Sequence, residues 1–255
     1  MKEKLVIGNW KMNKSFGEAD DLLNDIADKL QEYQLRTGVV MCPPYLYLEL
    51  ATDLADENDF SAGAQNCSEF DNGAYTGEIS AEMLSEIGIE FCIVGHSERR
   101  KYFSETNETI ARKIAQLLKY QIIPVVCCGE TLDERNAGKH FDVVEKQIKE
   151  CLFGLSNKEF ESVVIAYEPI WAICTGVTAT PAQAEEMHDF IRQLIEKKYG
   201  TEMAYGSYIL YGGSCNANNA LELFSQTNID GGLIGGASLN AKDFINIIEA
   251  AETVI

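Results

Sequence analysis

Three side chains with catalytic chemistry each follow a short apolar run in this 255-residue chain: Lys11, His96 and Glu168. A carboxylate can act as a general base, and an imidazole can donate or accept a proton. An ammonium group can stabilise a negative charge that develops during a reaction. These residue types suit general acid–base catalysis, provided that the fold brings them together.

Glu168 comes directly after the apolar run Val163–Tyr167 and is followed by Pro169. A carboxylate at the inner end of a buried strand loses solvation, which raises its pKa toward that of a useful base. A structural ion pair with an arginine or lysine is the alternative for Glu168. Lys11, taken alone, is more typical of an ordinary surface lysine.

His96 ends an apolar run and precedes Ser97-Glu98-Arg99-Arg100, which is typical of a capped helix start. The positive end of a helix disfavours imidazolium, so we expect His96 to be neutral and able to donate a hydrogen bond. The other two histidines, His140 and His188, lie in a polar segment and an amphipathic segment, and we expect structural or solvated roles for them.

Two glycine-bearing turns follow the last two apolar runs: Tyr211-Gly212-Gly213-Ser214 and Gly235-Gly236-Ala237-Ser238. Glycine allows backbone N–H groups to approach an anion closely. Such turns after the seventh and eighth strands of a (β/α)8 barrel commonly bind phosphate. A single Gly-Gly pair would be weak evidence, because most such pairs only form turns.

The elements that must position these residues alternate along the chain. Continuous apolar runs are typical of strands buried on both faces of a parallel sheet. The predicted strands are Leu5–Ile7, Val39–Cys42, Phe60–Ala64, Phe91–Val94, Ile122–Cys127, Val163–Tyr167, Tyr208–Tyr211 and Leu233–Ile234. Helical spacing of apolar residues lies between them, for example over 22–30, 107–118, 187–195 and 241–248. Thr180-Pro181 predicts a helix start.

Eight strands that alternate with helices in a chain of this length favour an α/β fold, a single-domain (β/α)8 barrel over residues 1–255. An open doubly wound sheet is the alternative, but its usual G-x-G-x-x-G motif is absent after the first strand. In a parallel barrel the carboxyl ends of all strands share one rim. The polar residues Asn9, Gln65 and Glu130 would therefore join the catalytic candidates there.

The formal charge of −19 argues against nucleic acid and against an anionic membrane surface as partners. No stretch reaches the ~18 apolar residues of a membrane helix. The apolar run near the N-terminus is too short for a signal peptide. We therefore expect a cytoplasmic protein.

The eight cysteines form no C-x-x-C pair and no zinc-ribbon spacing. In a cytoplasmic protein we expect reduced thiols, most of them packed as small apolar side chains. Cys127 and Cys128 would point to opposite sides of a strand, and no histidines are spaced as paired ligands. We expect no metal and no cofactor.

Eight segments in order along the chain resemble the signatures of the triosephosphate isomerase family. They are Gly8-Asn9-Trp10-Lys11-Met12-Asn13, Ala64-Gln65-Asn66-Cys67, Thr76-Gly77-Glu78-Ile79-Ser80, Gly95-His96-Ser97-Glu98-Arg99-Arg100, Cys128-Gly129-Glu130, Ala166-Tyr167-Glu168-Pro169-Ile170-Trp171-Ala172, Tyr211-Gly212-Gly213-Ser214 and Gly235-Gly236-Ala237-Ser238. Each is short, but their number and order make the resemblance specific. It implies a (β/α)8, or TIM, barrel that interconverts dihydroxyacetone phosphate and D-glyceraldehyde 3-phosphate in glycolysis and gluconeogenesis.

The resemblance also implies a role for each candidate. Glu168 would be the base, neutral His96 would polarise the carbonyl, and Lys11 with Asn9 would stabilise the enediolate and bind substrate. Glu98 and Cys127 match supporting positions. Backbone N–H groups near Cys174, Ser214, Gly235 and Gly236 would bind the phosphate. Triosephosphate isomerase is the standard example of this pairing of a glutamate base with a neutral histidine.

Two further features are implied by the resemblance alone. The segment 169–178 resembles a loop that closes over substrate and protects the intermediate from water. Thr76 resembles a residue that reaches the active site of a partner subunit, which implies a homodimer. Cys174 and Val177 depart from the family pattern at the loop tip, which predicts slower or weaker binding and sensitivity of Cys174 to oxidation.

Two other functions would each explain part of the sequence. A (β/α)8 barrel that binds a larger sugar phosphate or an indole phosphate would explain the glycine turns. It would not explain why Asn9, Lys11, His96 and Glu168 occur together. A non-catalytic binding protein of the same family is the other alternative, and only the loop change at Cys174 favours it.

Overall fold

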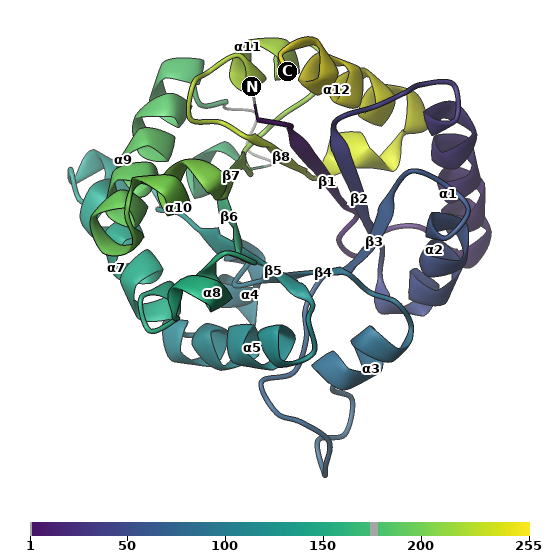
Figure 1. Cartoon of the computed structure of the whole chain (residues 1–255), viewed down its shortest axis with the longest axis horizontal. Helices are drawn as coiled ribbons and strands as arrows, with labels where there is room; N and C mark the ends of the chain where they lie inside the picture. Colours follow the sequence, from purple (N-terminus) through teal and green to yellow (C-terminus); the bar gives the residue numbers. More distant parts are fainter. Residues whose placement is uncertain (1, 174–177) are drawn as a thin grey trace.

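The structure, a computed structural model, describes residues 2–173 and 178–255. Eight parallel strands close into a barrel in which each strand pairs with its neighbours in sequence order, and β1 pairs with β8. Figure 1 shows the strands at the centre, surrounded by helices. The strands are β1 Leu5–Asn9, β2 Gly38–Cys42, β3 Ser61–Ala64, β4 Phe91–Val94, β5 Ile123–Cys128, β6 Val164–Tyr167, β7 Tyr208–Tyr211 and β8 Gly231–Ile234.

The helices lie outside the barrel, in the connections between strands and, for the last helix, after β8 (Figure 1). They are α1 Phe16–Leu30, α2 Leu48–Ala55, α3 Ala81–Glu86, α4 Ser97–Tyr102, α5 Asn107–Lys119, α6 Leu132–Asn136, α7 His140–Leu152, α8 Asn157–Phe160, α9 Pro181–Tyr199, α10 Thr201–Gly206, α11 Ala220–Phe224 and α12 Ala241–Thr253. Short 3₁₀ helices cover Tyr45–Tyr47, Ile170–Ala172 and Gly236–Leu239. Among the helices described, none is both long enough and apolar enough to cross a membrane.

The predicted barrel is confirmed, and every predicted strand falls on an observed one with ends that differ by at most two residues. The expected start of a helix at Thr180-Pro181 is confirmed as well. Thr180 caps α9, Pro181 is its first residue, and Gln183 completes the capping box.

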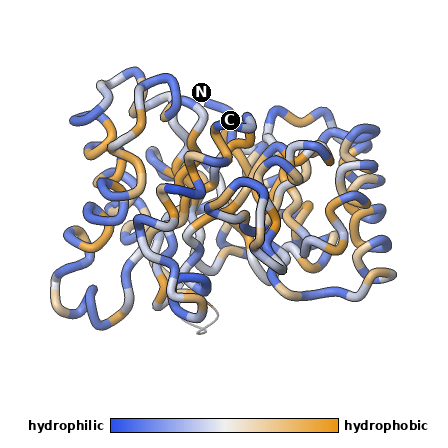
Figure 2. Tube along the Cα trace, turned by 90° about the horizontal axis from the view of Figure 1, so that it is seen from below, coloured by the Kyte–Doolittle hydropathy of each residue, from blue (hydrophilic) through white to orange (hydrophobic). Residues whose placement is uncertain are grey.

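Apolar side chains form two layers because successive residues of a strand point to opposite faces. Ile7, Ile93 and Leu210 are among those that fill the barrel interior. Val6 and Val94 instead face the helices, whose apolar sides pack against the outside of the barrel. In Figure 2 the apolar residues accordingly concentrate along the central strands and the helices.

The cysteines behave as small apolar side chains, as expected. Seven free cysteines are described, and all seven are buried. Cys127 belongs to the barrel interior and the adjacent Cys128 to the layer beneath the helices, so the two thiols do point to opposite sides of β5. His188 is fully buried in α9 and contacts the Asn228 carbonyl oxygen through Nδ1 at 3.3 Å, which fits the structural role expected for it.

Closure of the barrel between β8 and β1 depends on a residue without a side chain. Gly231 has φ of +140°, and a Cβ atom there would lie 2.0 Å from the Leu5 carbonyl oxygen. We expect Gly231→Ala to lower the free energy of unfolding by about 3 kcal/mol or more, since strain and a backbone clash add. Urea unfolding measures this as a lower midpoint.

Gly154→Ala is the matched control, because a Cβ atom at Gly154 would meet nothing within 4 Å. Its midpoint should stay close to that of the wild type. Equal midpoints for the two variants would contradict the prediction.

Candidate active site

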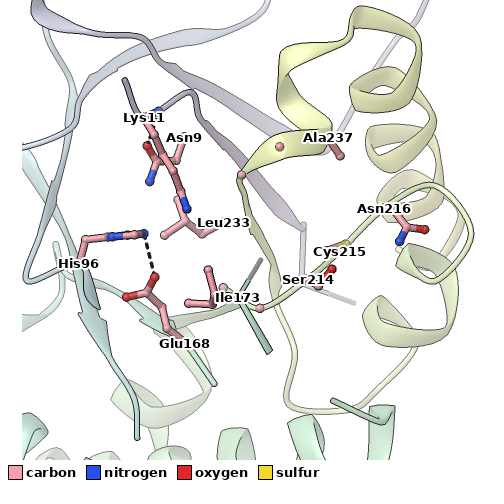
Figure 3. A pocket seen from close by; sticks show the side chains of 14 residues that line it. Asn9, Lys11, His96, Glu168, Ile173, Ser214, Cys215, Asn216, Leu233 and Ala237 are labelled. Carbon is pink, nitrogen blue, oxygen red and sulfur yellow. Dashed lines mark hydrogen bonds and ion pairs between the residues drawn. The ribbon is translucent and has the colours of Figure 1, made fainter. Parts of the chain in front are cut away.

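A cavity of about 240 Å³ opens at the carboxyl ends of the strands. This size is below the usual range for drug-sized ligands, so the cavity suits a small molecule. Seven predicted site residues line it: Asn9, Lys11, His96, Glu168, Ser214, Gly235 and Gly236. In Figure 3 the side chains of Lys11, His96 and Glu168 point toward one another across this space. The rim expected from parallel strands therefore brings together residues from five different strand ends.

Glu168 follows β6 and is only 1% exposed. Its Oε1 lies 2.9 Å from His96 Nε2, and its Oε2 accepts a hydrogen bond of 2.9 Å from the Ser97 N–H. Two further bonds fix its backbone environment: the Glu168 N–H donates to the Cys128 carbonyl oxygen, and the Gly212 N–H donates to the Tyr167 carbonyl oxygen, each at 2.7 Å. The carboxylate is therefore held from the start of α4, and its backbone environment is fixed from β5 and from the turn after β7.

The net pKa of Glu168 is lowered, which corrects the expectation that burial would raise it. Burial does act to raise the pKa, and it is the largest single cause. It is outweighed by the charge of His96 whenever the ring is protonated and by the hydrogen bond of His96, together with the Ser97 N–H and the charge of Lys11. The donors thus keep the carboxylate ionised, which is the form that a base requires. Burial does not make it more basic overall.

His96 occupies the N-cap position of α4, as the sequence indicated. Its Nδ1 accepts a hydrogen bond of 3.2 Å from the Glu98 N–H, so Nδ1 carries no proton in this geometry. The proton of the ring then lies on Nε2, which faces Glu168. This is the neutral tautomer that can donate a hydrogen bond from Nε2.

The pKa of His96 reflects opposing causes. Burial lowers it, whereas the charge and hydrogen bond of Glu168, with a smaller contribution from Glu98, raise it. The net direction is upward, opposite to the lowering expected from the helix N-terminus alone. The raising contribution depends on an ionised Glu168 beside the ring. A ligand that draws Glu168 away from Nε2 would leave burial and the helix N-terminus, and both favour the neutral ring.

Lys11 lies between the Glu168–His96 pair and the glycine turn after β8. Its Nζ pairs with Glu98 Oε1 at 2.7 Å, and a Cβ atom built on Gly235 would be 3.6 Å from Lys11 Cε. The backbone of Lys11 has φ of +53°, an uncommon conformation for a residue with a side chain. The Asn9 side chain accepts from the Lys11 N–H at 3.1 Å, and Gln65 donates to the Lys11 carbonyl oxygen at 2.9 Å. These bonds hold the strained residue in place.

The turn after β7 lies beside Glu168. A Cβ atom at Gly212 would approach Glu168 Cγ to 2.9 Å, so glycine leaves the space that the Glu168 side chain occupies. The Ser214 N–H, an expected phosphate donor, donates to the Ala172 carbonyl oxygen at 3.1 Å. It can bind an anion only when it releases that carbonyl group.

Glu98 and Cys127, the residues expected to support the site, lie next to the cavity. Glu98 contacts Lys11 through its carboxylate and His96 through its N–H, although it does not line the cavity. Cys127 lies in the barrel interior, and burial together with the negative charge of Glu168 raises the pKa of its thiol. Its contact with Glu168 is thus that of a neutral thiol.

Glu130, grouped with the rim residues by its position after β5, does not face the cavity. Its fully buried carboxylate accepts from the Tyr167 hydroxyl at 3.1 Å and from Trp171 Nε1 at 2.8 Å, and it pairs with Arg135 at 3.1 Å. It therefore anchors the segment that follows Glu168. The direction in which the Glu130 side chain points follows only from the packing of that segment over β5.

Three expectations concern residues that are not placed in the cavity. Thr76 lies in the exposed loop between β3 and α3, which projects from the barrel in Figure 1. Cys174 and Val177 lie outside the described residues.

Sequence reasoning missed several lining residues: Ile173, Cys215, Asn216, Leu233 and Ala237. It also missed the Ser97 N–H as a partner of Glu168. The residue type of Ser97 does not reveal that its backbone N–H is a donor to Glu168. The N-cap position of His96 does predict free N–H groups in the first turn of α4. Within residues 2–173 and 178–255, no three His, Cys, Asp or Glu side chains are grouped so that they could hold a metal ion.

Fold and site together define a (β/α)8-barrel enzyme with one buried carboxylate–imidazole pair beside two glycine turns. The family model described as triosephosphate isomerase matches residues 4–251. The chain therefore belongs to the triosephosphate isomerase family, and it is an isomerase.

Individual relatives agree with the family. The triosephosphate isomerase of Porphyromonas gingivalis is 47% identical over 250 residues, which cover 98% of this chain and 100% of the relative. The triosephosphate isomerase of Chloroherpeton thalassium is 48% identical over 252 residues, 99% of this chain and 100% of the relative. That of Bacteroides fragilis is 46% identical over 98% of this chain and 99% of its own length.

We expect Glu168→Gln to lower the pKa of His96, because the substitution removes the carboxylate whose charge stabilises imidazolium. Titration of the ring signals by NMR measures the shift, and the chain has only three histidines to assign. His188, whose pKa burial lowers to about 3, stays neutral throughout the useful range.

Glu145→Gln is the control, because Glu145 lies on α7 and pairs only with Lys149, at 2.6 Å, among the described ion pairs. It should leave the pKa of His96 unchanged. A pKa of His96 that is the same in wild type and Glu168→Gln would show that the pair is not electrostatically coupled.

Proposed function

We propose that this protein interconverts dihydroxyacetone phosphate and D-glyceraldehyde 3-phosphate, with Glu168 as the base. The observation that carries the proposal is the buried pair of Glu168 and His96, 2.9 Å apart, at the wall of a small cavity beside Lys11. Family membership supports the same reaction, because the relatives are named triosephosphate isomerases.

The proposed reaction moves one proton between neighbouring carbons. Glu168 takes a proton from the carbon next to the substrate carbonyl, and the electron pair of that C–H bond forms the C=C bond of an enediolate. His96 donates its Nε2 proton to the carbonyl oxygen and recovers a proton from the neighbouring hydroxyl group. Glu168 then returns its proton to the other carbon, so atoms and charge balance and no cofactor is needed.

Lys11 and Asn9 would stabilise the negative charge of the intermediate. The Lys11 ammonium group lies at the cavity wall and is held there by Glu98 at 2.7 Å. In a site shielded from water, a fixed cation favours a developing oxyanion more strongly than it would in bulk water. Asn9 fixes the backbone of Lys11 and also lines the cavity.

The substrate phosphate would lie against the turns after β7 and β8. Gly235 and Gly236 begin the 3₁₀ helix Gly236–Leu239, and Ser214 belongs to the turn after β7. N–H groups at a helix start attract an anion. Cys174, the remaining expected donor, lies outside the described residues.

We expect Glu168→Gln to lower kcat/KM for glyceraldehyde 3-phosphate by ~10³-fold or more, since the base is lost and a neutral amide cannot accept the proton. A coupled assay of isomerisation measures the loss. Glu145→Gln, which changes a partly exposed glutamate on α7, should keep wild-type activity. Near-background rates in the wild type would contradict the proposed reaction.

We further propose a homodimer in which Thr76 reaches the partner's active site. Large apolar side chains lie exposed after each of the first four strands: Met12 at 95%, Leu46 at 82%, Tyr75 at 43% and Phe103 at 64%. Tyr75 stacks on Phe70 with ring centroids 4.2 Å apart, so the projecting loop has an ordered apolar surface. Exposed apolar side chains gathered on one side of a molecule are typical of an interface.

Sedimentation equilibrium should give twice the chain mass of 28.3 kDa for the wild type. We expect Thr76→Arg to shift the mass toward that of one chain, because a buried unpaired charge disfavours the interface. Leu221→Arg adds the same charge at an exposed position on α11, across the barrel from the loop in Figure 1, and should remain dimeric. A wild type that sediments as a single chain would contradict the dimer.

The remaining expectations complete the proposal. One catalytic domain would span residues 1–255, and the enzyme would act in the cytoplasm in glycolysis and gluconeogenesis. Its partners would be the triose phosphate and a second copy of the chain, with no role for nucleic acid or membrane. The charge of −19 supports the last point.

A further inference from the structure

The Arg100 guanidinium joins the ends of two neighbouring strands. From α4, its Nε donates to the Gly95 carbonyl oxygen at 2.7 Å, and its Nη2 donates to the Cys127 carbonyl oxygen at 3.0 Å. Gly95 follows the end of β4, and Cys127 belongs to β5. The β4–β5 ladder pairs Phe91–Val94 with Ile123–Val126, so Arg100 acts one residue beyond its last pair. Its two bonds replace the ladder where the strands diverge.

These two carbonyl groups adjoin the catalytic pair. Gly95 immediately precedes His96, and the next residue, Ser97, donates its N–H to Glu168 at 2.9 Å. Cys127 immediately precedes Cys128, whose carbonyl oxygen accepts from the Glu168 N–H at 2.7 Å. A shift between the ends of β4 and β5 would therefore move His96 relative to Glu168.

A third hydrogen bond fixes the orientation of the Arg100 guanidinium group. Arg100 Nη1 donates to Asn107 Oδ1 at 2.6 Å, and Asn107 is the first residue of α5. Asn107 in turn donates to Glu150 on α7 at 2.7 Å. The planar guanidinium can serve three directions at once, which a single ammonium group at the end of a flexible chain cannot do in the same geometry.

The backbone at Gly95 needs such support. Gly95 has φ of +71°, and a Cβ atom there would lie 3.1 Å from Arg100 Nη2 and 3.3 Å from the Cys127 carbonyl oxygen. The sharp change of direction after β4 turns His96 toward the cavity. Without the hydrogen bonds from Arg100, Gly95 would be free to adopt other conformations, because glycine has the fewest restrictions on φ and ψ.

We propose that Arg100 is a positioning residue that sets the distance between His96 and Glu168 by fixing the ends of β4 and β5. It contacts neither the cavity nor the substrate, and it acts through Gly95 and Cys127. The inference deepens the proposed function and rests on it for its kinetic consequences. Its geometric consequence, the placement of the His96 ring, does not depend on turnover.

The test compares Arg100→Lys and Arg100→Met with the wild type. We expect both variants to lose ~10²-fold in kcat with KM within ~3-fold, because a misplacement of about 1 Å in a catalytic pair costs this much and leaves ground-state binding intact. The lysine variant keeps the positive charge but loses the planar guanidinium group that makes the three hydrogen bonds. The ring signals of His96 in NMR spectra of the ligand-free protein should move in both variants.

Arg36→Met is the matched control, since Arg36 lies just before β2 at the amino end of the barrel and pairs with Glu252 at 3.1 Å. It should keep wild-type kcat and wild-type His96 signals. A kcat of Arg100→Lys equal to that of the wild type would overturn the proposal, because charge alone would then suffice. If Arg100→Met fails to fold, Arg100→Lys decides by the same criteria.

The kinetic and spectroscopic readouts separate the two proposals. An inactive wild type would refute the proposed reaction, and the His96 signals of Arg100→Lys would then decide the positioning role alone. Unchanged signals would overturn it, and shifted signals would support it. An active wild type with unchanged kcat in Arg100→Lys would overturn only the positioning role.

Discussion

A carboxylate cannot remain ionised in a protein interior unless charges and donors surround it, and this requirement organises the site around Glu168. The residue is 1% exposed, so nearly all of its compensation comes from protein groups. His96 and the Ser97 N–H supply it from the start of α4, and Lys11 adds its charge from the loop after β1. These donors come from two distant parts of the chain, and the closed barrel brings them together around Glu168.

Further residues hold Glu168 and its donor Lys11 in place. Gly212 leaves room for the Glu168 side chain, and Glu130 anchors the segment after it through Tyr167 and Trp171. Lys11 is held in an uncommon backbone conformation by Asn9 and Gln65. The strained backbone of Lys11 and the close approach at Gly212 lie at the carboxyl ends of the strands, where the geometry of the site is decided.

The sequence predicted the strands well because parallel strands buried on both faces are continuous apolar runs, and those runs leave few alternatives. The rim position of Lys11, His96 and Glu168 followed from the barrel itself, without any contact being known. Prediction failed where a property depends on partners. The pKa of Glu168 is lowered rather than raised, because donors that the residue type does not reveal outweigh burial. Glu130 shares the rim but turns away from the cavity.

The sequence by itself determined the barrel, the order of its strands and the set of residue types at one rim, because hydrophobic periodicity and strand ends are local properties of the chain. Only the tertiary structure decided how far His96 lies from Glu168, which tautomer His96 adopts, and which groups set the distance between the two side chains. These depend on hydrogen bonds between residues distant in sequence, such as those of Arg100 with Cys127 and of Glu168 with Ser97. Such distances are set by packing to fractions of an ångström, and residue order alone does not specify them.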